Sequence, residues 1–542
     1  MASPTAKDNL ETEFESLNGA NPENLLSTLK ALRQIVKAEG QRTFQDWRSQ
    51  IQRAEFLPSA LNLAEYLALR RHDLRFLQAA LMPWGLSSLG RIEARVMPNL
   101  DAVIATLGVI CGADPAEQKH PPMESFFEGN RLLRQHTEEL FGPALPQRRV
   151  KIMVTLPTEA ATDYTLVREI VRRGANCVRI NCAHDAPDLW AQMITHTRQA
   201  TAETGHSCKV MMDLAGPKIR TGPVLAPLHQ SRVFRGDYIV LTRHHAADNS
   251  TRSTDDAPPA TVEHVQTSCT VPAILDLLTV GTAVYIDDGK IRTQVVDTYY
   301  PDASGQPGLL LQVTHVRPKG VKLKPEKGLN FPHTELSLSP LTEKDLQDLD
   351  FVATQADMIG YSFVQRPADI EQLQQELAKR VEVGRALPAI VAKIETAVAV
   401  TNLPELIIHA AGKQVFGVMI ARGDLAVEIG YQRLTEIQEE ILWLCEAAHV
   451  PVIWATQVLE SLVKNGAPSR GEMTDAAMAE RAECVMLNKG PFIAEAITIL
   501  DDVLTRMETH QLKKKRLNCG LSAPGERLPA PKYRHATGDG EQ

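Results

Sequence analysis

Eight short apolar runs, alternating with helix-like stretches, constrain the fold of this chain more than any other feature. The runs are 150–156, 177–181, 209–214, 358–363, 389–395, 415–421, 450–456 and 484–488. Their length and β-branched content are typical of parallel strands that are buried on both faces. Eight strand–helix units closing into a ring form a TIM (β/α)8 barrel, and the sequence predicts this α/β fold. An open doubly wound sheet is the alternative, but no GxGxxG turn follows the first run.

The rest of the chain divides into segments of different residue composition and pattern. Asn21-Pro22 is a helix start signal, and apolar residues then recur on one helical face at Leu25, Leu29, Leu32 and Ile35. An insertion after the third run has short β-like stretches and turns such as Asp288-Gly289, so we expect an all-β lid over the barrel mouth. The predicted segments are a disordered N-terminus (1–20), a helical domain (21–112), a linker rich in proline and polar residues (113–147), the first part of the barrel (148–217), the inserted β lid domain (218–330), the second part of the barrel (331–512) and a basic, disordered tail (513–542).

Composition excludes several classes of protein. The 542 residues are 44% hydrophobic and 23% charged with a net charge of −8, so we expect no nucleic-acid partner. No apolar run is long enough to cross a bilayer, and the acidic N-terminus lacks the features of a signal peptide. The eight cysteines form no CxxC pair, which is typical of reduced thiols. A cytoplasmic protein without a membrane partner is therefore expected.

Charged residues gather where two successive strands end. The run 389–395 ends with Lys393 and Glu395, and the run 415–421 leads into Arg422 and Asp424. The carboxyl ends of barrel strands form the reactive face. Glu395 and Asp424 could hold one hard divalent cation, and Lys393 shares a strand face with Glu395. A cation beside a metal indicates chemistry on a phosphate or an enolate.

A second charged string follows the third strand. It reads DLAGPKIRTG at 213–222 and brings Asp213, Lys218 and Arg220 together. A hinge into the insertion would need the Gly216-Pro217 pair but not these charges. Arg220 suits bidentate binding of a phosphate.

These motifs, with others in the same order, resemble the pyruvate kinase family over roughly 148–510. The carriers are KIMVTL at 151–156, VRINCAH at 178–184, DLAGPKIRTG at 213–222, YIDDG at 285–289, EKG at 326–328, TEKDLQDL at 342–349, AKIE at 392–395, ARGDLAVEI at 421–429, ATQVLESL at 455–462 and PSRGEMTDAA at 468–477. The resemblance implies transfer of a phosphoryl group from phosphoenolpyruvate to ADP, giving pyruvate and ATP in glycolysis. It also implies dependence on Mg2+ or Mn2+.

The resemblance implies a role for each rim residue. The implied catalytic residues are Lys393, Arg179 and Thr456. The implied substrate and phosphate ligands are Arg179, Lys393, Arg422, Gly423, Asp424 and Thr456, with backbone amides near Arg422–Asp424 taking the substrate carboxylate. The implied metal ligands are Glu395 and Asp424. The implied nucleotide side consists of Asn181, His184, Arg220 (also near phosphate oxygens) and Lys327, the last reaching down from the lid.

The sequence departs from the family pattern at the monovalent-cation site. Asn181 and Asp213 remain, but Ala183 and Leu214 stand where the family has Ser and Thr. Lys218 stands where the family has Glu and could supply the missing positive charge, so we predict that K+ is not required. The last rim motif is 488–491, NKGP, in place of Ser-Gly-Glu-Thr, which leaves open a weakened turnover.

Other readings stay open. We expect no counterpart of the family's C-terminal regulatory domain, and the helical N-terminal region could replace its subunit contacts, which leaves a homo-oligomer open. One alternative function is a metal-dependent aldolase or lyase that binds a pyruvate enolate. Another is a weakly active regulatory relative.

Overall fold

A closed parallel barrel is the centre of the computed structural model. The model describes residues 21–510, apart from 117–118, 228–229, 244–261, 303–304, 333, 335–337 and 383. The predicted disordered ends, 1–20 and 513–542, lie outside the described residues. The barrel strands are β1 (Lys151–Thr155), β2 (Cys177–Asn181), β3 (Lys209–Asp213), β11 (Met358–Tyr361), β12 (Ala389–Ile394), β13 (Phe416–Ala421), β14 (Val452–Ala455) and β15 (Cys484–Leu487). They pair in the order β1-β15-β14-β13-β12-β11-β3-β2, so the barrel prediction is confirmed and the open-sheet alternative is excluded.

Helices surround the barrel and side chains fill its interior. The surrounding helices are α7 (Tyr164–Arg172), α8 (Pro187–Thr204), α9 (Glu343–Gln355), α10 (Pro367–Arg380), α11 (Ala397–Thr401), α12 (Leu403–Ala411), α13 (Arg422–Ile429), α14 (Tyr431–Ala447), α15 (Glu460–Asn465), α16 (Arg470–Met478) and α17 (Ile493–His510). The interior cluster includes five methionines, Met153, Met211, Met358, Met419 and Met486. This packed core leaves the strand ends as the place for polar chemistry.

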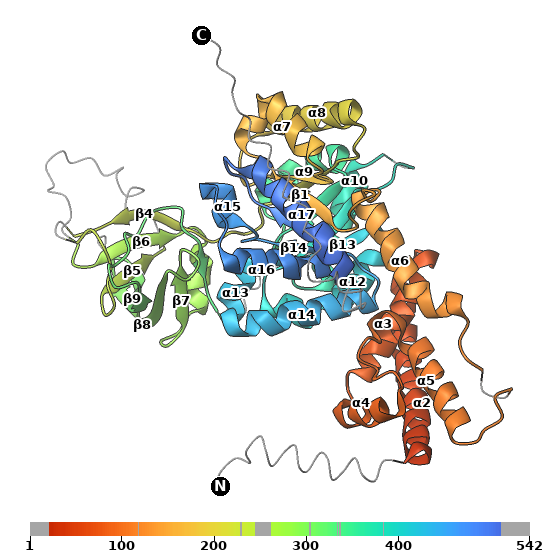
Figure 1. The fold of residues 1–542 in the computed structure, drawn as a ribbon. Coiled ribbons are helices and arrows are strands. Elements are labelled where there is room, and N and C mark those ends of the chain that lie inside the picture. The colour runs from red at the N-terminus through yellow and green to blue at the C-terminus, as the bar shows by residue number, and fades with distance from the viewer. Residues whose placement is uncertain are drawn as a thin grey trace, which may run out of the picture.

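The insertion forms a separate β body beside the barrel (Figure 1). Its strands are β4 (Thr221–Leu225), β5 (Tyr238–Thr242), β6 (Val265–Cys269), β7 (Ala283–Ile286), β8 (Ile291–Pro301), β9 (Pro307–Val316) and β10 (Leu329–Asn330). They form one sheet in the order β10-β7-β8-β9-β5-β6-β4 around a core of its own. The chain leaves the barrel after β3 and returns before α9, which keeps the β body at the carboxyl end of the strands.

An N-terminal helical region lies on the opposite side of the barrel from the β body (Figure 1). Its main helices are α2 (Pro22–Trp47), α3 (Leu57–Leu69), α4 (Arg75–Leu81) and α5 (Val96–Ile110). The side chain of Asn21 caps α2 by accepting a hydrogen bond from the Asn24 amide at 2.8 Å. The expected apolar face was wrong at Ile35, which is exposed, because Val36 is the residue one turn beyond Leu32 and is buried.

Segment 113–147 is not a plain linker, which corrects that prediction. It contains α6 (Met123–Phe141), whose Leu140 and Phe141 join the cluster of Met153 at the barrel interior. The prolines misled the prediction, because Pro121 and Pro122 precede the helix and do not interrupt it. Helix α6 thereby closes the floor of the barrel.

The helical region is attached to the barrel by specific hydrogen bonds. Trp47 donates its Nε1–H to Glu405 of α12 at 2.9 Å, and Asn62 donates to the carbonyl of Ala447 at 2.8 Å. Within the described part of the chain, no helix combines the length and apolar character that crossing a membrane requires.

Candidate active site

A cavity of about 180 Å3 opens at the carboxyl ends of the barrel strands. It brings together ten of the residues that the sequence singled out. They are Arg179, Asn181, His184, Asp213, Lys218, Arg220, Lys393, Glu395, Asp424 and Thr456. These residues come from the ends of five strands, β2, β3, β12, β13 and β14, or from the segments that follow them, and they are far apart in the chain. The closed barrel is therefore what assembles them.

Lys393 is the centre of a buried network of charges. Its ammonium lies 3.0 Å from Oε1 of Glu395 and 3.4 Å from Oδ2 of Asp213, and it donates a hydrogen bond to Ser362 Oγ at 2.7 Å. Burial alone would lower the pKa of Lys393, but the two carboxylates outweigh burial and raise it. The lysine is thus a fixed positive charge that faces the cavity.

Arg179 supplies the second cation. It forms an ion pair with Oδ2 of Asp213 and donates a 3.3 Å hydrogen bond to Thr155. Although burial would raise the pKa of Asp213, Arg179 and Lys393 lower it, so this side chain remains a carboxylate. Its other oxygen, Oδ1, is buried without a hydrogen-bond partner among the described residues.

Glu395 and Asp424 have the properties of a divalent-metal site. Burial and the charge of Asp424 raise the pKa of Glu395, despite Lys393 and a 2.6 Å hydrogen bond from the Phe363 amide. Two carboxylates that repel each other in this way fit a hard cation, which would take its other oxygen ligands from substrate and water. No group of three or more His, Cys, Asp or Glu side chains suited to a metal occurs among the described residues.

The loop after β14 has a strained backbone. Thr456, Gln457 and Leu459 all have positive φ angles, of 65°, 59° and 49°. Such backbone concentrates at functional sites and persists only when its surroundings hold it. Thr456 Oγ1 accepts a 2.9 Å hydrogen bond from the Gly423 amide at the start of α13. Thr456 is therefore fixed against the helix N-terminus that the sequence assigned to substrate binding.

The Arg422 side chain does not line the cavity. Its guanidinium stacks over the ring of Trp454 at 4.6 Å, forms an ion pair with Asp475 and donates to the carbonyls of Ala455 and Thr456. Arg422 therefore braces the strained loop. A substrate role is left to the backbone amides beside it, of which the Gly423 amide already donates to Thr456.

The side of the cavity assigned to nucleotide is more open. Asn181 Oδ1 accepts a 3.1 Å hydrogen bond from the Ala183 amide. Burial and the nearby charge of Lys489 lower the pKa of His184. Arg220 donates a 2.9 Å hydrogen bond to the carbonyl of Glu326 in the β body, which ties the cavity wall to the insertion.

Lys327 is not brought to the cavity. Its ammonium lies 3.2 Å from Oδ1 of Asp287 within the β body, and its side chain is about one-third exposed. The sequence placed two further residues at strand ends without giving them a role in the site, namely Ser362, which accepts a hydrogen bond from Lys393, and Lys489, whose charge acts on His184. Ser362 follows β11 directly and Lys489 lies two residues beyond β15, so the strand-end position was the signal that pointed to them.

Known proteins are similar to this chain in sequence and in fold. The family model "Pyruvate kinase, barrel domain" matches residues 147–496. A pyruvate kinase of Methylorubrum extorquens is 33% identical over 384 residues, covering 70% of this chain and 72% of that protein. Pyruvate kinase 2 of Synechocystis is 30% identical over 375 residues, covering 67% of this chain and 58% of that protein.

A solved structure agrees with these matches. The crystal structure of a pyruvate kinase from Cryptosporidium parvum superposes with a TM-score of 0.56 at 26% identity, covering 69% of this chain and 72% of that chain. The matched part of this chain thus spans between 58% and 72% of these relatives. The chain belongs to the pyruvate kinase family.

Proposed function

We propose that this protein transfers the phosphoryl group of phosphoenolpyruvate to ADP, giving pyruvate and ATP, the reaction that pyruvate kinases carry out in glycolysis. The observation that carries the proposal is the ammonium of Lys393, held between Asp213 and Glu395 beside Arg179. Phosphoryl transfer depends mainly on positioning and on stabilising the charge of the transferring group. Two fixed cations in one half-enclosed cavity supply both.

Each end of the substrate has a fitting partner. Arg179 and Lys393 would bind the phosphoryl oxygens, and Lys393 would also stabilise the enolate oxygen that transfer leaves behind. The backbone amides at the start of α13 would bind the substrate carboxylate. Thr456 would lie near the carbon that gains a proton. Glu395 and Asp424 would hold Mg2+ or Mn2+, which supplies a Lewis acid beside the phosphoryl group.

The nucleotide would bind on the side of Asn181, His184 and Arg220. Lys327 can join these residues only if the β body moves toward the barrel and the pair with Asp287 opens. Such closure would exclude water, which competes with ADP for the phosphoryl group.

We propose further that activity does not require K+. Ala183 and Leu214 offer no side-chain oxygen, and Lys218 lines the same cavity as Asp213. Asp213 Oδ1 is the one fully buried acceptor of this cavity that has no hydrogen-bond partner among the described residues. The ammonium of Lys218 would then provide the charge that a bound monovalent cation provides in the family pattern.

A coupled assay tests both proposals. Purified protein, phosphoenolpyruvate, ADP and Mg2+ should yield ATP at equal rates in potassium buffers and in potassium-free tetramethylammonium buffers. A steep requirement for potassium would contradict the second proposal alone. Absence of ATP, together with carbon–carbon cleavage of a 2-oxo acid, would favour the aldolase alternative, which the similarity to pyruvate kinases does not support.

A further inference from the structure

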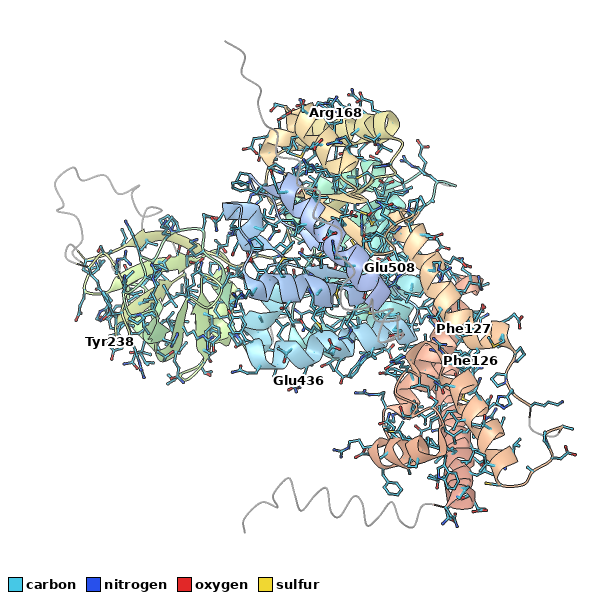
Figure 2. All side chains as sticks on the ribbon, in the orientation of Figure 1. Phe126, Phe127, Arg168, Tyr238, Glu436 and Glu508 are labelled. Atoms are coloured by element: carbon cyan, nitrogen blue, oxygen red, sulfur yellow. The ribbon has the colours of Figure 1, made fainter. Side chains whose placement is uncertain are left out.

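A second cavity lies at the floor of the barrel, where β1 begins, at the end opposite the candidate active site. Its volume is about 340 Å3, which is in the range of small-molecule sites. The helical region, α6, the start of β1 and the end of α14 all contribute to its wall. Figure 2 labels two of its aromatic residues, Phe126 and Phe127, where α6 approaches the helical region.

The most unusual residue of this floor cavity is Lys151. It is the first residue of β1 and shares a strand face with Met153, so its side chain lies inside the lower end of the barrel. The residue is 1% exposed, and its Nζ has no hydrogen-bond partner among the described residues. Burial lowers its pKa to about 8. An ammonium with unused donors at a cavity wall is costly unless a ligand satisfies it.

Arginines line the same cavity as this lysine. The guanidinium of Arg95 lies 4.9 Å and 5.3 Å from the ring centroids of Phe126 and Phe127, and it donates to Asn130 at 2.6 Å. Its Nε is buried without a partner among the described residues. The cation is therefore held in place against an aromatic wall. Arg134 also lines the cavity, and its side chain is exposed.

The charge balance of the wall favours an anion. Five cationic side chains line the cavity, Arg91, Arg95, Arg134, Arg149 and Lys151, against the three carboxylates of Glu138, Glu446 and Glu483. Arg149 is already paired with Glu480 and Glu508, which lie outside the lining, so the other four cations face the three carboxylates. The Glu483 carboxylate accepts a 3.0 Å hydrogen bond from the Val452 amide, which occupies one of its oxygens. The remaining excess of positive charge, with the unused donors of Lys151 and Arg95, suits an anionic group such as a phosphate monoester.

We propose that the floor cavity binds a small phosphate monoester, with Lys151, Arg95 and Arg134 holding the phosphate and Phe126 and Phe127 contacting the organic part. The site does not depend on the proposed phosphoryl transfer, because it shares no lining residue with the active-site cavity. The helical region forms one of its walls, so this region has a binding role beyond packing.

Inorganic phosphate is the probe, titrated calorimetrically into the full-length protein without Mg2+. Phosphate should also enter the active site, so the variants are compared with wild type. Lys151→Met and Arg134→Ala should each weaken one component of binding at least about tenfold, the effect of losing about 1.4 kcal/mol. The surface variant Lys379→Met should bind as wild type does. Mn2+ affinity should not change in any variant, because the active site is untouched.

Two results would overturn the proposal. One is a wild-type protein whose only phosphate binding disappears in Arg179→Met, since that binding belongs to the active site. The other is a phosphate isotherm that is the same for wild type and Arg134→Ala. Arg134 is exposed and does not belong to the hydrophobic core, so this variant decides the question if Lys151→Met does not fold.

Discussion

Replacing Lys393 with methionine isolates the contribution of the buried ammonium. Methionine keeps the length of the side chain but loses three contacts, those to Glu395 at 3.0 Å, Asp213 at 3.4 Å and Ser362 at 2.7 Å. Removing a single fixed donor from a site that stabilises developing charge costs about 100- to 1,000-fold in kcat, or about 2.7–4 kcal/mol. We expect kcat to fall by at least the upper end of this range, because Lys393 carries a full charge.

The same change should destabilise the fold. Asp213 keeps its ion pair with Arg179, whereas Glu395 keeps only the hydrogen bond from the Phe363 amide. Breaking a buried pair by removing one partner costs about 3–5 kcal/mol. Urea unfolding should show this loss, and Mn2+ should bind at least as tightly as to wild type, because one negative charge of the site is no longer balanced.

The assay couples ATP formation to light emission and is run beside unfolding and Mn2+ titrations of the same preparations. Lys379→Met, a change at an exposed lysine of α10, is the matched control and should behave as wild type. A folded Lys393→Met protein whose kcat stays within about tenfold of wild type would refute the electrostatic reasoning.

Two further variants test other parts of the structure. Asp424→Asn should weaken Mn2+ binding by about 10- to 100-fold or more, because replacing a residue that only orients a metal ligand already lowers metal affinity by this factor. Unchanged Mn2+ affinity, measured by electron paramagnetic resonance, would show that Asp424 is not part of the metal site. Glu65→Gln tests a carboxyl that is 7% exposed and whose pKa is raised to about 7 by burial and by Asp101. Because the folded protein then binds a proton more tightly than the unfolded chain, stability should fall as pH rises from 4.5 through 7, by up to about 3 kcal/mol. Glu65→Gln should remove that part of the pH dependence. If the free energy of unfolding in urea changes between pH 5 and pH 8 by the same amount in wild type and in Glu65→Gln, this explanation is wrong.

The local pattern of apolar and polar residues was enough to predict the barrel and most of the residues at the carboxyl ends of its strands. Runs buried on both faces can only be parallel strands or core helices, and eight of them alternating with helices close into a ring. Once the barrel is assumed, the carboxyl ends of its strands must converge. The sequence therefore predicts that Lys393, Glu395 and Asp424 lie together, and the cavity contains all three.

The sequence could not show which side chains are already engaged by distant partners. Arg422 follows a strand end as Asp424 does, yet Asp475 and Trp454 hold it away from the cavity. Lys327 belongs to a family motif, yet Asp287 holds it in the β body. These contacts join residues that come together only when the loops pack. The periodicity of a strand gives no information about loop packing.

The sequence by itself determined the eightfold alternation and the charges at the strand ends, because both follow from periods of two and 3.6 residues that act locally. Tertiary structure alone decided that α6 closes the barrel floor and that Lys151 is left there with unused donors above a cavity. The physical reason is that the burial and the pairing of a side chain depend on which residues surround it in the folded protein. In the sequence, Lys151 looks like any charged residue at the start of a strand.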